Sequence, residues 1–81
     1  MEVRVQFYSY FKDLTGCAET RQSLPAGSRI ENLLSRLFQQ FPRLAAMQRS
    51  MLIAVGVEYQ PCDYVLNDGD EISLFPPVQG G

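Results

Sequence analysis

Histidine is absent from this sequence of 81 residues, and cysteine occurs only twice. Because histidine is the commonest general base and the commonest metal ligand, its absence argues against a self-sufficient hydrolase or metalloenzyme. The two cysteines, Cys17 and Cys62, are far apart in the sequence and make no zinc site without histidine. We expect both to be free thiols in a reducing cytoplasm, and we expect this chain to bind no metal.

Long apolar runs and clusters of basic residues are also missing. The longest apolar run, Met51 to Val57, is far shorter than the roughly 20 residues that a membrane-spanning helix needs. No basic region leads an apolar one at the N-terminus, so no signal peptide is predicted. The net charge is −2 and the seven basic residues are scattered, which argues against nucleic-acid binding. The sequence predicts a cytoplasmic protein with neither a membrane nor a nucleic acid as partner.

Basic residues are absent beyond Arg49, so the segment from Ser50 to Gly81 carries only negative charges. These come from Glu58, Asp63, Asp68, Asp70, Glu71 and the terminal carboxylate. If this end of the chain carries the function, we expect the functional end to be negative and its partner to offer a basic groove.

What is present is the pattern of one small α+β domain. Apolar and polar residues alternate over residues 3–8, which predicts a half-buried strand. Residues 10–15 break the alternation and predict a short helical turn with Gly16 at its C-terminal cap. Residues 19–24 are more polar and predict an edge strand, with Thr20 and Leu24 pointing inward.

The strongest pattern is an amphipathic helix that follows a turn at residues 25–27. Its apolar residues recur at helical spacing and form one stripe: Ile30, Leu33, Leu34, Leu37, Phe38 and Phe41. Ser28 and Glu31 match a capping box at its start, and Pro42 ends it. Burying six large side chains, at about 1.5–3 kcal/mol each, would be the main hydrophobic contribution in so small a chain. We therefore expect this helix to lie across a sheet.

Two later segments predict further strands. Residues 51–57 are apolar on both faces and predict a central strand, and Asn67-Asp-Gly69 predicts a tight turn. In the last strand, Glu71 to Phe75, Ile72 and Leu74 share the core face, whereas Phe75 points away from the helix. The expected architecture is a mixed sheet of four to five strands with one main helix packed across it. It comprises a domain over residues 1–75 and an extended tail over residues 76–81.

The tail combines two prolines with two terminal glycines. Pro76 and Pro77 cannot donate to a strand ladder and favour an extended exit from the sheet. Gly80 and Gly81 have no Cβ, so this backbone can enter a narrow channel and bend at the reacting carbon. We expect the carboxylate of Gly81 to be the reacting group. A carboxylate is a poor electrophile, so a partner would have to activate it, for example as an adenylate, and would supply ATP and metal.

These residues carry a resemblance. Residues 68–81 read Asp-Gly-Asp-Glu-Ile-Ser-Leu-Phe-Pro-Pro-Val-Gln-Gly-Gly. This segment resembles the C-terminal signature of the MoaD/ThiS family of ubiquitin-like sulfur carriers. Within that family it is most similar to the MoaD branch, which comprises the small subunits of molybdopterin synthase. Residues 5–16 and 52–55 resemble other conserved parts of that family. Gln79 and Gly56 depart from it, since the family often has Ser or Thr and Asn there. The resemblance implies a ubiquitin-like β-grasp fold.

It also implies a mechanism and a set of partners. Gly81 would be adenylated by a MoeB-like enzyme and converted to a thiocarboxylate, with sulfur from a donor such as a cysteine desulfurase or rhodanese. The tail would enter a MoaE-like large subunit, in a heterotetramer of two small and two large subunits, and donate sulfur to cyclic pyranopterin monophosphate (precursor Z) to form molybdopterin. This chain would be a non-catalytic subunit in molybdenum cofactor biosynthesis. Its expected docking residues are Phe75, Pro76, Pro77, Val78 and Gln79.

Other readings of the tail stay open at this point. The nearest is a carrier for another pathway, such as the thiamine-type carrier ThiS, although those carriers usually lack the two prolines found here at Pro76 and Pro77. Another is a ubiquitin-like modifier that forms isopeptide bonds with lysines, and a third is a binding module with an idle tail. An enzyme acting alone is the weakest reading, because no pair of nucleophile and base is visible.

Overall fold

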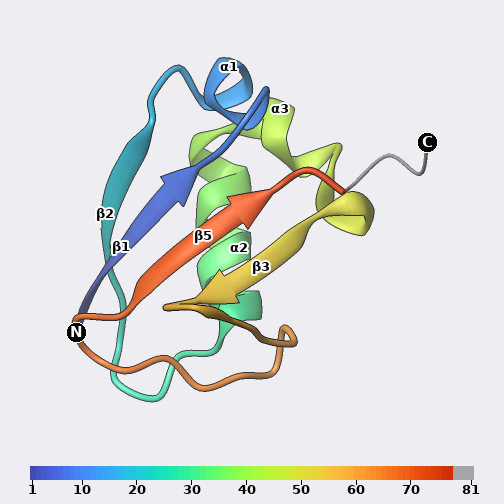
Figure 1. The fold of residues 1–81 in the computed structure, drawn as a ribbon. Coiled ribbons are helices and arrows are strands. Elements are labelled where there is room, and N and C mark those ends of the chain that lie inside the picture. Colours follow the sequence, from blue (N-terminus) through green and yellow to red (C-terminus); the bar gives the residue numbers. More distant parts are fainter. Residues whose placement is uncertain (78–81) are drawn as a thin grey trace.

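A computed structural model gives the arrangement of the chain and describes residues 1–77 (Figure 1). Within these residues the chain forms five strands, three α-helices and one 3₁₀ turn. In chain order they are β1 (Glu2–Phe7), α1 (Phe11–Thr15), β2 (Glu19–Ser23), α2 (Ile30–Gln40), α3 (Pro42–Ala45), the 3₁₀ turn η1 (Gln48–Ser50), β3 (Leu52–Val55), β4 (Glu58–Tyr59) and β5 (Glu71–Phe75). None of the helices within residues 1–77 is long and apolar enough to cross a membrane.

The five strands form one mixed sheet in the order β2-β1-β5-β3-β4. The central pair, β1 and β5, is parallel and places Phe7 opposite Leu74, whereas every other neighbouring pair is antiparallel. The last strand of the chain therefore lies in the middle of the sheet, between the first strand and β3 (Figure 1). The α+β architecture predicted from the sequence is confirmed.

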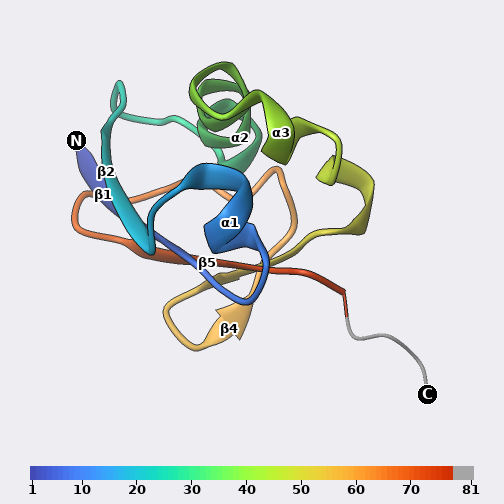
Figure 2. The ribbon, with the colours of Figure 1, turned by 90° about the horizontal axis from the view of Figure 1, so that it is seen from above.

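α2 crosses one face of this sheet, and no helix within residues 1–77 covers the other face (Figure 2). Four residues of the predicted stripe are buried in the core, namely Ile30, Leu33, Leu34 and Leu37. Phe38 and Phe41 are partly buried at the margin, where the Phe41 ring meets the edge of Phe7 with centroids 5.7 Å apart. From the sheet side the core is completed by alternate residues of β1 and β5, namely Val3, Val5, Phe7, Ile72 and Leu74.

The start of α2 differs from the predicted capping box. The helix begins one residue later than the box requires, so Arg29 and not Ser28 is its N-cap. The Asn32 side-chain oxygen accepts a hydrogen bond from the Arg29 backbone N–H at 2.8 Å. The Ser28 hydroxyl is instead used in the preceding turn, where it donates to the Pro25 carbonyl at 2.7 Å. Ser28 thus ends the turn, and Asn32 takes the role predicted for Glu31.

Two strand predictions also need correction. β3 ends at Val55, because Gly56 adopts a left-handed φ of 62° and turns the chain into β4. Val57, predicted inside the strand, is 99 % exposed at that turn. β2 is an edge strand as predicted, but its most buried residue is Gln22, whose side-chain amide exchanges two hydrogen bonds with that of Gln40 on α2. A polar residue can be buried there because its amide is fully paired.

The remaining local predictions are confirmed. α1 is a single helical turn, and Gly16 caps it with a φ of 77° while its N–H donates to the Lys12 carbonyl. Phe11 from this turn is fully buried in the core. The tight turn at residues 67–69 has Gly69 at a φ of 85°, and the Asp70 N–H donates to the Asn67 carbonyl at 3.0 Å. This turn delivers the chain into β5.

Candidate functional site

The site predicted from the sequence begins where β5 leaves the sheet. Phe75, the last residue of β5, lies opposite Leu52, the first residue of β3. Beside it, the Tyr8 N–H donates to the Leu74 carbonyl at 3.1 Å, which extends the pairing with β1 to the end of the strand. Pro76 and Pro77 follow directly and are half-buried. The end of β5 is thus held on both sides, and the chain leaves it at a defined place, beside the turn that precedes β3 (Figure 1).

Three aromatic rings, from Tyr8, Tyr59 and Phe75, gather at this place and are called the exit cluster below. The rings of Tyr8 and Phe75 are stacked, with centroids 4.6 Å apart and planes inclined by 15°. Tyr59 meets Phe75 edge to face at 6.5 Å. Tyr8 and Tyr59 are 39 % and 69 % exposed, so much of this apolar surface remains in contact with water. Aromatic surface of this kind is enriched at protein interfaces.

The exit cluster lies on the face of the sheet that α2 leaves open. Strand residues alternate between faces, so Phe75 faces away from the buried Leu74 that precedes it. Tyr59 is paired with Ala54, which follows the core residue Ile53 and so lies on this open face as well. Tyr8 stacks on Phe75 from the same side. The prediction that Phe75 points away from the helix is therefore confirmed. The Tyr8 ring is held further by its hydroxyl, which donates to the Gln6 side-chain oxygen at 2.6 Å. A stacked and hydrogen-bonded Tyr8 restrains the ring of Phe75 at the start of the tail.

The sequence prediction missed Tyr8 and Tyr59. A signal was present for Tyr8, because it is an aromatic residue at the polar position of the alternating pattern in residues 3–8. No such signal existed for Tyr59, which reaches the cluster only through the pairing of β4 with β3. The other predicted tail residues, Val78, Gln79, Gly80 and Gly81, lie outside the described residues, so their roles and the division of the chain at residue 75 stay predictions.

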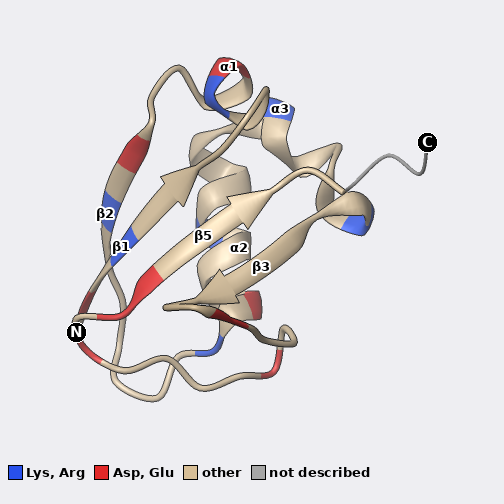
Figure 3. Ribbon diagram, viewed as in Figure 1, with Lys and Arg blue, Asp and Glu red and all other residues tan. Residues whose placement is uncertain are grey.

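The structure places only part of the negative charge that the sequence predicts for this end of the chain. The acidic residues 68, 70 and 71 lie at the start of β5, and the strand then runs away from them to Phe75. At about 3.3 Å per strand residue, Glu71 is about 13 Å along the strand from Phe75, which exceeds the screening length of physiological salt, about 8 Å. Figure 3 shows several acidic segments toward the end of the molecule that holds the N-terminus, together with basic segments on β1 and β2, and it shows basic segments on α1, α3 and η1, of which α1 also carries an acidic one. The acidic residues of the turn before β5 therefore do not surround Phe75, whereas Glu58 lies beside Tyr59 and the terminal carboxylate lies outside the described residues. The negative functional end and the basic partner groove facing it stay predictions.

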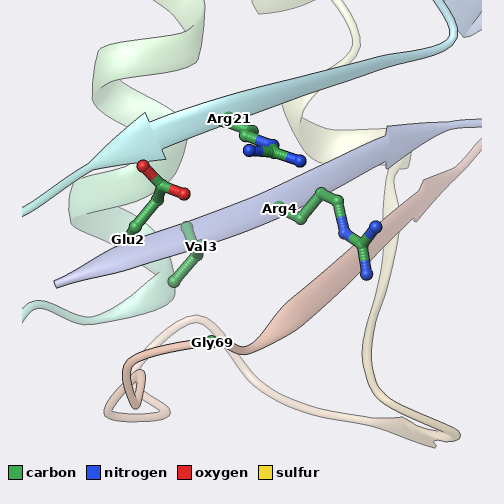
Figure 4. A pocket seen from close by; sticks show the side chains of 5 residues that line it. All are labelled: Glu2, Val3, Arg4, Arg21 and Gly69. Atoms are coloured by element: carbon green, nitrogen blue, oxygen red, sulfur yellow. The ribbon is translucent and has the colours of Figure 1, made fainter.

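Depressions on the described surface are shallow. One of about 320 Å³ is lined by Glu2, Val3, Arg4, Arg21 and Gly69. Its charged side chains come from β1 and β2, and Gly69 contributes backbone from the turn before β5 (Figure 4). Arg4 there forms exposed ion pairs with Glu71 at 3.4 Å and with Glu19 at 3.9 Å. This depression is at the start of β5, the opposite end from the exit cluster. Within residues 1–77, no three His, Cys, Asp or Glu side chains gather closely enough to hold a metal ion.

Similarity to known proteins extends over almost the whole chain. Residues 5–81 match the ThiS family. The molybdopterin synthase sulfur carrier subunit of Escherichia coli is 32 % identical over 81 residues, with 98 % of this chain and 99 % of the relative covered. A putative molybdopterin converting factor subunit 1 from Pyrococcus furiosus has a similar structure, with a TM-score of 0.89 and 28 % identity over 96 % of this chain and 99 % of that one.

Two further solved structures bear on partners and on fold. One is a complex of subunits 1 and 2 of the molybdopterin-converting factor from Helicobacter pylori, with a TM-score of 0.72 and 26 % identity, both chains being covered completely. The other is small archaeal modifier protein 1 from H. volcanii, with a TM-score of 0.87 and 18 % identity over 95 % of this chain and 98 % of that one. The second likeness shows the fold alone. The ubiquitin-like β-grasp fold implied by the sequence is confirmed.

Proposed function

The chain belongs to the ThiS family, and we propose that it is the sulfur-carrier subunit of a molybdopterin synthase. The observation that carries this proposal is the similarity to sulfur carrier subunits of that enzyme along nearly the full length of both chains. The similarity includes the tail, since the family match runs to residue 81. Every such relative is named a sulfur carrier subunit, which supports a sulfur-carrier role for this chain. The chemistry and the individual partners are part of the proposal.

The proposed chemistry takes place on the carboxylate of Gly81. A carboxylate oxygen attacks the α-phosphorus of ATP, pyrophosphate leaves, and the acyl adenylate makes the carbonyl carbon electrophilic. A sulfur nucleophile from the donor then displaces AMP and leaves a thiocarboxylate, whose sulfur is nucleophilic as a thiolate is. That sulfur displaces an oxygen substituent on a carbon of cyclic pyranopterin monophosphate, and water then hydrolyses the resulting thioester, which leaves sulfur on the pterin precursor and regenerates the carboxylate of Gly81. Because molybdopterin contains two such sulfurs, the carrier is used twice. The ATP and its metal ion belong to a MoeB-like activating enzyme, and this chain binds neither.

The fold supports a carrier whose tail reacts in partner enzymes while its core stays folded. The core under α2 is formed by residues up to Leu74, so the proposed reacting end follows a strand that is anchored on both sides. The exit cluster of Tyr8, Tyr59 and Phe75 offers a partner an apolar surface next to the emerging tail. We assign docking to Phe75, Pro76 and Pro77 together with the two tyrosines, and to Val78 and Gln79 within the receiving channel. Aromatic anchors that become fully desolvated often dominate the binding energy of an interface.

The proposed partners are a MoaE-like large subunit, a MoeB-like activating enzyme and a sulfur donor such as a cysteine desulfurase or rhodanese. The large subunit is supported by the complex of subunits 1 and 2 of the H. pylori molybdopterin-converting factor, whose subunit has 26 % identity to this chain. We extend that pairing to a heterotetramer of two small and two large subunits. The activating enzyme and the sulfur donor are inferred from the chemistry, because the carboxylate needs both an ATP-dependent activation and a source of sulfur.

The first test is intact-mass spectrometry of the protein after incubation with ATP, the activating enzyme and a sulfur source. The expected result is a mass gain equal to the replacement of one oxygen by sulfur, with the change located in the C-terminal peptide. A thiocarboxylated chain that sulfurates the thiamine precursor but leaves the pyranopterin unchanged would assign it to the other pathway. Covalent conjugates with lysines of other proteins, formed without any sulfur transfer, would assign it to the ubiquitin-like modifiers.

A second test removes Gly81. We expect the deletion, or the addition of one residue after Gly81, to abolish pterin sulfuration, because the reacting carboxylate is displaced from its position in the partner. The melting temperature should stay unchanged, because the buried core residues within residues 1–77 lie between Val3 and Leu74. Gln79→Ala is the control, since it alters the tail but leaves the terminal Gly-Gly in place. Pterin sulfuration by the chain that lacks Gly81 would refute the proposed role of this carboxylate.

A further inference from the structure

Three basic side chains lie at the end of the molecule from which the tail emerges, and they are called the basic rim below. They are Lys12 on α1, Arg43 on α3 and Arg49 on η1. All three are exposed, and within residues 1–77 the only ion pairs are those of Arg4 at the other end of β5. The single acidic residue on these three elements is Asp13. The rim therefore carries a net positive charge that no described carboxylate neutralises by direct contact.

The rim borders the exit cluster on two sides. Lys12 and Tyr8 line one shallow depression of about 260 Å³, and Tyr8 in turn stacks on Phe75. Glu19 lines the same depression, but its carboxylate is paired with Arg4 at 3.9 Å. Arg49 belongs to the turn just before β3, whose first residue Leu52 is paired with Phe75. Arg43 follows on α3, which packs against α1. An interface of ordinary size buries about 800 Å² on each partner, which is wide enough to include the exit cluster and its basic border.

At the opposite end of the molecule the acidic side chains outnumber the basic side chains Arg4 and Arg21. Its acidic residues include Glu2, Asp68, Asp70 and Glu71, and Glu2 and the turn are joined by a hydrogen bond from the Glu2 N–H to the Asp68 side chain at 2.8 Å. The charges are thus unevenly distributed along β5, with an excess of basic segments on α1, α3 and η1 (Figure 3), although the net charge of the chain is −2. A net charge of −2 would by itself favour a basic partner. The arrangement of the charges favours an acidic one at the end that carries the tail.

We propose that the basic rim docks on a carboxylate-rich surface of the partner protein, at the border of the cavity that receives the tail. This inference rests on the proposed function, in that it takes the partner to be the protein that accepts the tail. Charges at the border of an interface act mainly on the association rate and on its salt dependence. The polarity of the carrier would turn its tail-bearing end toward the partner during the encounter and its acidic end away.

The test measures association rates by stopped-flow fluorescence with the large subunit from the same organism, at low and at high ionic strength. Arg49→Glu and Lys12→Glu are compared with Arg21→Glu on β2, which lies beside Arg4 at the other end of the sheet (Figure 4). Each substitution replaces one positive charge by one negative charge, so each takes the net charge from −2 to −4. The control therefore reproduces the change in net charge without touching the rim. All three residues are exposed, and melting curves verify that the variants fold.

We expect Arg49→Glu and Lys12→Glu each to slow association about tenfold at low ionic strength, and the difference from the unsubstituted chain to vanish at high ionic strength. Arg21→Glu should change the rate less than about twofold. Equal effects of the rim and control substitutions, no effect, or faster association of the rim variants would each overturn the inference. If the unsubstituted chain itself fails to bind the large subunit, the proposed function fails, and the inference that rests on it fails as well.

Discussion

On the face of β5 that lies under α2, Ile72 and Leu74 have no exposed surface, whereas the neighbouring Phe75 points to the open face and stacks on a tyrosine that is itself 39 % exposed. The two faces belong to one strand of five residues. The covered face closes the core, and the open face at its end holds aromatic surface that nothing in residues 1–77 covers. Adjacent residues of one strand are therefore expected to separate stability from partner binding.

The largest effect is expected on the covered face. Leu74→Ala should lower the free energy of unfolding by about 2–5 kcal/mol, because it removes a fully buried side chain and leaves a cavity under α2. Chemical denaturation measures this loss, and any fall in pterin sulfuration should follow the fraction of unfolded protein. A loss below about 1 kcal/mol would contradict a close-packed core at this position.

The next effect is expected one residue further along the strand. Phe75→Ala should weaken binding of the large subunit by at least about 30-fold, or about 2 kcal/mol, as for an aromatic residue at the centre of an interface. The unfolding free energy should fall by only about 1 kcal/mol, which corresponds to the lost stacking with Tyr8. Isothermal titration calorimetry and chemical denaturation of the same sample separate the two effects.

Tyr59→Ala is the matched control for this substitution. Tyr59 is 69 % exposed and meets Phe75 only edge to face, so its loss should weaken binding less than the loss of Phe75 does. If Phe75→Ala destabilised the fold as strongly as Leu74→Ala and left binding unchanged, the separation of the two faces would be refuted.

The covered face was predictable from the sequence because it depends on local periodicity. The alternation in residues 3–8 and the helical stripe from Ile30 to Leu37 each determine which side chains face inward, whatever the final topology. The place of Ile72 and Leu74 follows from the same rule. Local conformation limited these predictions in two places, where Gly56 ends β3 early and Asn32 replaces Glu31 in capping α2.

The open face was less predictable because it depends on which strands are neighbours. Phe75 meets Tyr8 only because β5 pairs in parallel with β1, a pairing between the two ends of the chain. The sign of the charge at the exit depends on topology in the same way. Asp68 and Phe75 are close in sequence, but an extended strand carries the chain away from the acidic turn and toward Arg49. Counting charges along the sequence could not give this result.

The smallest effect is expected at the charged part of the open face. Arg4→Met removes both ion pairs, with Glu19 and with Glu71, but keeps an apolar stem along the strand. The Arg4 side chain is 48 % exposed and its partners are exposed to a similar degree, so water and salt screen these pairs. We expect the unfolding free energy to change by less than about 0.5 kcal/mol, and this change to shrink further at high ionic strength. Denaturation at two salt concentrations measures it. A salt-sensitive loss above about 1 kcal/mol would mean that ion pairs stabilise the open face as well, and stability would then not be confined to the side under α2.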